Sequence, residues 1–103
     1  MKIGHDTDNQ QVNVTVELFG SARLATGRRS VAVTLPSRAL RSEVASALGR
    51  ACPELRGVVV TEDGSDLAPS YTFNLNGRQF VADERVTLTE GDALLLFSSL
   101  SGG

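Results

Sequence analysis

The chain ends in two glycines, Gly102 and Gly103, and its C-terminal carboxylate is the group best placed to react. Glycine has no side chain to obstruct a narrow channel, and it adopts backbone angles closed to other residues. Extended residues after Ser99 reach about 13 Å, enough to enter another protein's enclosed site. A carboxylate is a poor electrophile, but a mixed anhydride with AMP would let a sulfur nucleophile transfer sulfur to Gly103. A Gly-Gly ending alone also fits an ordinary frayed terminus.

Other reactive side chains give weaker signals. Cys52 is the one cysteine and His5 the one histidine, so the chain has no intramolecular disulfide and no set of zinc ligands. A lone cysteine near a helix end is typical of a small buried hydrophobe, with a persulfide carrier as the alternative. Glu62, Asp63 and Asp66 lack the glycine and glutamate spacing of a calcium loop, which predicts a solvated turn.

Composition excludes several classes of function. The formal net charge is -2, and the ten Lys and Arg residues are scattered, so we expect no nucleic-acid partner. No apolar run approaches the roughly 18 residues of a membrane span, and the first residues are polar rather than a signal peptide. We expect a cytoplasmic protein with one domain of 103 residues.

The N-terminal half predicts a leader and two strands. Residues 1–11 are polar and aperiodic, which indicates a disordered leader before a domain at 12–98 and a flexible tail at 99–103. Strict alternation predicts strands at 12–19 and 30–35, joined by a hairpin loop at 20–27. The positions expected to be buried are Val12, Val14, Val16, Leu18, Val31, Val33 and Leu35.

After Pro36 the apolar period lengthens to that of an amphipathic helix. Ser37 is the predicted N-cap, and Pro53 should end the helix near Ala51 or Cys52, because proline disfavours helical geometry in the residue before it. The predicted buried stripe is Leu40, Val44, Ala47, Leu48 and Ala51.

The C-terminal half predicts three more strands. Residues 71–75 form one strand, and Asn76-Gly77 indicates a type I′ turn into a short partner at 79–81. The apolar run at 93–97 predicts a central strand covered on both faces. The order of elements favours an α+β mixed sheet packed on one main helix.

Four motifs carry a resemblance to a known family: 19–27 after the first strand, Asn76-Gly77-Arg78, Glu90-Gly91-Asp92 and the terminal 97–103. Together they resemble the MoaD/ThiS family of ubiquitin-like β-grasp sulfur carriers, closer to the small subunit of molybdopterin synthase. The resemblance implies a β-grasp fold and adenylation of the terminal glycine by an E1-like enzyme that uses ATP and Mg. It also implies conversion of that glycine to a thiocarboxylate.

By the same resemblance the chain is a carrier and not an enzyme, and it binds no cofactor or metal itself. A sulfur acceptor such as the large subunit of molybdopterin synthase would be a second partner. The expected partner-binding residues are Phe97, Leu100, Ser101, Phe19 and Arg23. For Phe97 a place in the core is the alternative, and for Arg23 a solvated position.

Ser98-Ser99 stands where the molybdopterin branch often has Pro-Pro, which predicts a less rigid tail and leaves the pathway open. The acceptor could belong to thiamine, cysteine or specialised sulfur metabolism. A ubiquitin-like modifier, joined to lysines of target proteins through an amide at Gly103, uses the same residues. A binding module with an inert tail is the fourth interpretation.

Overall fold

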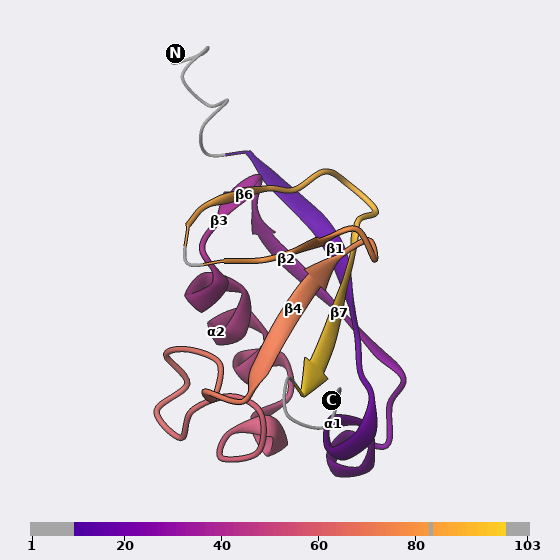
Figure 1. The fold of residues 1–103 in the computed structure, drawn as a ribbon, viewed down its shortest axis with the longest axis vertical. Helices are drawn as coiled ribbons and strands as arrows, with labels where there is room; N and C mark the ends of the chain where they lie inside the picture. Colours follow the sequence, from indigo (N-terminus) through magenta and orange to yellow (C-terminus); the bar gives the residue numbers. More distant parts are fainter. Residues whose placement is uncertain (1–9, 83, 99–103) are drawn as a thin grey trace.

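The computed structural model describes residues 10–82 and 84–98. Residues 1–9, which include His5 and most of the predicted leader, lie outside the described part, as does the predicted tail at 99–103. Figure 1 shows the fold: a sheet with the longer helix against one of its faces.

The first two strands form the predicted antiparallel pair. β1 (Gln11–Glu17) begins one residue before the expected start and pairs along its whole length with β2 (Ser30–Pro36). All seven positions that alternation marked as buried are buried, which confirms the predicted register of apolar faces.

The predicted hairpin loop at 20–27 is wrong, because α1 (Gly20–Thr26) occupies it. Its residues include good helix formers and no β-branched residue before Thr26, so one short helix is locally favourable. Gly27 closes the helix at φ 69°, where its N–H donates to the Arg23 carbonyl over 2.8 Å.

The main helix starts later than expected. α2 (Arg41–Ala51) has Leu40 and not Ser37 at its N-cap position, because Arg38–Ala39 forms a strand, β3, with β6 (Val86–Thr87). Neither short strand was predicted. The Leu40 N–H donates to the Glu43 carboxylate over 2.8 Å, so a side chain within the first turn of α2 satisfies this backbone group at the helix start.

The helix ends as Pro53 predicts, with the Cys52 N–H bonded to the Leu48 carbonyl and η2 (Pro53–Leu55) following. The expected stripe is partly wrong, since Ala51 is exposed and Leu40 only half-buried. The buried residues of α2 are Val44, Ala45, Ala47, Leu48 and Gly49.

The third strand and its turn are confirmed. β4 (Tyr71–Leu75) has the predicted bounds, and β5 (Gln79–Phe80) pairs with it. Both central turn residues have positive φ, 56° at Asn76 and 75° at Gly77, as a type I′ turn requires. Arg78 N–H donates to the Leu75 carbonyl over 3.0 Å and closes the turn.

β7 (Ala93–Ser98) is the central strand, as predicted. The sheet order is β2-β1-β7-β4-β5, with β7 parallel to β1 and antiparallel to β4. The expectation that β7 is covered on both faces is wrong. Leu94 and Leu96 are buried, but Leu95 and Phe97 are only half-buried, because α2 covers one face of the sheet alone.

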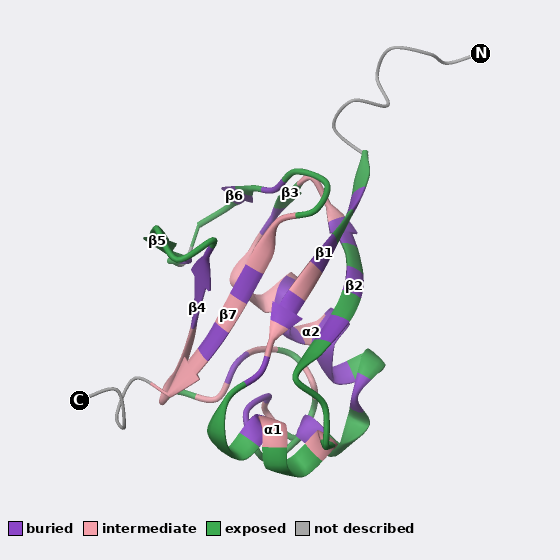
Figure 2. Ribbon diagram, turned by 90° about the vertical axis from the view of Figure 1, so that its right-hand side faces the viewer, coloured by how far each residue is buried: buried purple, intermediate pink, exposed green. Residues whose placement is uncertain are grey.

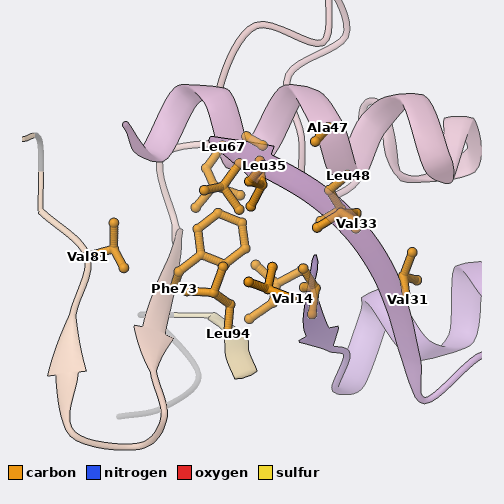
Figure 3. Close-up of a cluster of buried hydrophobic side chains, with 14 of the residues drawn as sticks. Val14, Val31, Val33, Leu35, Ala47, Leu48, Leu67, Phe73, Val81 and Leu94 are labelled. Carbon is orange, nitrogen blue, oxygen red and sulfur yellow. The ribbon is translucent and has the colours of Figure 1, made fainter. Parts of the chain in front are cut away.

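The core lies between the sheet and α2. Figure 3 shows the Phe73 ring between side chains from the sheet and the helix side, among them Leu35, Leu67 and Leu94. Each such apolar side chain stabilises the fold by about 1.5 to 3 kcal/mol when fully buried. This packing fixes β7 in the middle of the sheet.

Candidate functional site

The sheet has an uncovered face on the side away from α2, and Figure 2 looks onto it. Cross-strand pairing places Thr72 opposite Phe97, and Asn74 opposite both Leu95 and Phe80. Residues paired in this way lie side by side on one face. We call this surface the open face; its residues are Phe19, Thr72, Asn74, Phe80, Leu95 and Phe97.

Two of the predicted partner-binding residues stack at one end of the open face. The rings of Phe19 and Phe97 are parallel within 4°, with centroids 5.6 Å apart. Phe19 directly precedes α1, and Phe97 is the penultimate residue of β7. Phe19 is 37% exposed and Phe97 half-buried, so the pair is a surface feature and Phe97 is not a core residue.

Arg23 joins this pair from the last turn of α1. Its guanidinium carbon lies 5.5 Å from the centroid of the Phe19 ring, a cation–π distance. Its Nε donates to the Leu18 carbonyl over 3.2 Å, which holds the side chain in place. Arg23 is therefore anchored over the Phe19 ring and not freely solvated, although its role with a partner stays a prediction.

The remaining predicted site residues, Leu100, Ser101, Gly102 and Gly103, lie outside the described residues. Ser98 ends β7 and pairs with Tyr71. The residues just before the tail thus belong to the central strand, and the Phe19–Phe97 pair lies beside that exit point.

Sequence reasoning missed three further apolar residues at the surface, two of them exposed and one half-buried. Leu24 on α1 is 86% exposed and Phe80 on β5 is 63% exposed, while Leu95 is half-buried on the open face. Leu95 and Phe97 fall on alternate positions of the predicted last strand. If only one face of that strand had been assumed to be covered, Leu95 would have been predicted on the uncovered face together with Phe97. Phe80 needed the β4–β5 register, which the sequence alone does not supply.

Hydrogen bonds connect the turn before β7 to β1 and to the turn after β4, and so fix the position of the central strand along its neighbours. The Glu90 carboxylate accepts from the Asn13 backbone N–H at 2.9 Å and from its side chain at 3.1 Å. Asp92 accepts from the Thr89 N–H at 2.8 Å and from the Asn76 side chain at 3.1 Å. These hydrogen bonds lower the pKa of both carboxyl groups, most through the backbone N–H of Asn13 for Glu90 and of Thr89 for Asp92.

Comparison with known proteins finds solved structures that are similar to this one. No protein-family model matches the chain, and no curated protein matches it either. Its structure is similar to that of SAMP1 from Haloferax volcanii, with a TM-score of 0.70 and 28% identity over 88% of this chain and 99% of that one. A second structure, of H. volcanii small archaeal modifier protein 1, has a TM-score of 0.68 and 26% identity over 84% and 97%.

The fold is the ubiquitin-like β-grasp. Small archaeal modifier protein 1 (SAMP1) from Methanosarcina acetivorans shares it with a TM-score of 0.70 at 20% identity, over 91% of this chain and 99% of that one. The predicted α+β class with one main helix is thus confirmed.

Within this β-grasp domain, Cys52 has the structural role expected from the sequence. The residue is 1% exposed, and burial raises the pKa of its thiol above the usual value, while Arg28 opposes that shift with Nη1 at 3.7 Å from Sγ. A buried thiol with a raised pKa is a poor nucleophile, which argues against a persulfide role.

The acidic loop is only partly the solvated turn that was predicted. Glu62 and Asp63 are exposed, but Asp66 is half-buried and paired with Arg41 through two hydrogen bonds of 3.0 and 3.1 Å. In the described residues of the β-grasp domain no three His, Cys, Asp or Glu side chains are grouped to hold a metal ion. Nor does that part of the chain have a helix long and apolar enough to cross a membrane.

Proposed function

We propose that this protein is a cytoplasmic ubiquitin-like carrier whose reacting group is the carboxylate of Gly103, taken as the mature C-terminus. The observation that carries the proposal is the similarity to SAMP1 across 99% of that chain, combined with a central strand that ends at Ser98, five residues before Gly103 in the sequence. The chain itself presents the carboxylate, and partner enzymes perform the catalysis.

In the proposed reaction an E1-like enzyme binds ATP and Mg. A carboxylate oxygen of Gly103 attacks the α-phosphorus, and pyrophosphate leaves. Sulfide then attacks the carbonyl carbon of the acyl adenylate and AMP leaves, so that sulfur has replaced one oxygen. With a persulfide donor, a thiol must afterwards reduce the S–S bond and become a disulfide.

The resulting thiocarboxylate carries a soft nucleophilic sulfur that a second partner can pass to an electrophilic substrate. The motif at 19–27, with Phe19 and Arg23, favours the large subunit of molybdopterin synthase as this acceptor. Phe19, Phe97 and Arg23 form the described part of the docking surface that we propose, and Leu100 and Ser101 would extend it.

A protein modifier is the second candidate. The similar structures are of proteins named modifiers, which favours an amide bond from Gly103 to a lysine of a target protein. The activated acyl adenylate is common to both functions, and they differ in whether sulfur or an amine receives the acyl group.

Pyrophosphate exchange into ATP, catalysed by an E1-like enzyme from the same cell, tests the shared first step. We expect exchange with the wild-type chain and none after deletion of Gly103, while Glu84→Gln at an exposed site serves as the matched control. Exchange that survives the deletion contradicts the proposal. If the exchange depends on Gly103, a denaturing gel distinguishes the two functions, because a modifier forms covalent conjugates with target proteins and a sulfur carrier does not.

A further inference from the structure

Asn74 is a buried polar residue in the middle of β4. Its neighbours Phe73 and Leu75 point into the core, so the alternation of a strand turns Asn74 toward the open face. There it is nevertheless only 7% exposed. Among the described residues its Oδ1 is the buried side-chain oxygen that has no hydrogen-bond partner.

Such an acceptor destabilises the fold, because it gives up hydrogen bonds to water and gains none from the protein. A leucine or valine at this position would avoid the cost. An asparagine with an unsatisfied oxygen is better explained by a donor that arrives from outside the chain.

The surroundings of Asn74 indicate what such a donor is attached to. Its two cross-strand neighbours are Phe80 on β5 and Leu95 on β7, and the next pair along the strand is Thr72 and Phe97. The acceptor therefore lies beside three apolar side chains, Phe80, Leu95 and Phe97, while Thr72 and, across β7 from Asn74, Glu17 form the polar margin of this surface. A partner that covers this surface must bring apolar side chains together with one N–H or O–H group.

Phe80 is the movable part of this arrangement. It is 63% exposed and belongs to a two-residue strand at the edge of the sheet. Because most of Phe80 is exposed, a shift of its ring would cost little packing, and as the cross-strand neighbour of Asn74 it is the side chain whose shift would let a donor reach Oδ1. Leu95, on the other side, belongs to the central strand and is held by pairing on both edges.

We propose that Asn74 Oδ1 is a specificity contact for the activating enzyme, which donates an N–H or O–H to it while apolar side chains cover Leu95 and Phe97. The identity of this partner rests on the proposed function. Apolar contacts alone allow many different surfaces to bind. A buried acceptor lowers the affinity for any partner that has no donor to pair with it, and so adds specificity.

A pair of small probes tests the contact without any partner protein. Indole is an apolar ring with one N–H donor, and 1-methylindole lacks that donor. In titrations followed by the amide shifts of Leu95 and Phe97, we expect indole to bind about three- to tenfold more tightly than 1-methylindole to the wild-type chain. In Asn74→Leu the two affinities should become equal.

Thr72→Val is the matched control, since it removes a hydroxyl from the same strand and face and should keep the difference between the probes. Asn74→Leu should also raise the melting temperature, by about 4 to 8 °C, because it removes an unsatisfied acceptor. If Asn74→Leu does not fold, Asn74→Ala replaces it. Equal affinities for the wild-type chain, or no shifts with either probe, would overturn the inference.

The activating enzyme gives the second measurement. Asn74→Leu should raise the KM for the carrier about tenfold or more and leave kcat nearly unchanged. An unchanged KM would refute the contact with this enzyme. If the enzyme fails to activate the wild-type chain, the result contradicts the proposed function with this enzyme and not the inference about Asn74. The indole comparison alone then decides whether Asn74 is a recognition contact.

Discussion

The stacked pair of Phe19 and Phe97 is the residue-scale feature that links the fold to a partner. We expect Phe97→Ala to lower the free energy of unfolding by about 0.5 to 1.5 kcal/mol, because it removes an aromatic contact at a half-buried position. Leu24→Ala, at a far more exposed site, should stay within about 0.5 kcal/mol of wild type. Urea denaturation checks both, and equal stability of the two variants would contradict the role given to the stack.

Cys52 provides a second test at the residue scale. Because its thiol is buried and its pKa is raised, native protein should react with iodoacetamide far more slowly than unfolded protein. Cys52→Ala should lose stability but still accept sulfur at Gly103. Loss of sulfur transfer in a folded Cys52→Ala variant would show that this cysteine carries the sulfur.

Among the elements, the turn before β7 makes stability depend on pH. Glu90 and Asp92 have folded pKa values below their ordinary 4.5 and 3.8, so their stabilisation is complete above about pH 4.5. It is lost as the pH falls through the lowered values. We expect the urea midpoint to decrease on acidification, and less steeply in Asp92→Asn. An identical acid profile for this variant would show that the turn does not anchor β7.

The end of α1 depends on one backbone conformation. Gly27 has φ 69°, and an added Cβ would meet no atom within 4 Å. Gly27→Ala should therefore cost about 1 kcal/mol through the backbone alone. Thermal unfolding measures this, and a stabilised variant would contradict the αL cap.

The same elements show how much the sequence alone could predict. Alternation located β1, β2 and their buried faces, and Asn76-Gly77 located the turn after β4, because these signals are local. The helix at 20–26 was missed because about two turns are too short to show a periodic apolar pattern. β3 and β6 are two residues each, and only their pairing with one another creates them.

For the site, the sequence predicted Phe19, Arg23 and Phe97 through a resemblance, but not their contact. That Phe19 and Phe97 stack depends on α1 lying at the end of β7, which is a tertiary relation. Asn74 was overlooked because an asparagine in a strand shows its cost only when its neighbours are known.

At the scale of the whole molecule, folding and chemistry are assigned to different parts of the chain. The core residues lie between Val12 and Leu96, whereas the proposed reacting group is Gly103. Deletion of Gly103 should thus leave the melting temperature unchanged while abolishing activation. A drop in melting temperature would mean that this glycine also supports the fold.

The central claim is that a β-grasp domain presents Gly103 for conversion to a thiocarboxylate. The most direct measurement is the intact mass of the protein after incubation with its activating enzyme, ATP, Mg and a sulfur donor, with tandem mass spectrometry to locate the change. We predict a gain equal to the difference between sulfur and oxygen, located at Gly103. An unchanged mass, or sulfur located on Cys52, would contradict the account.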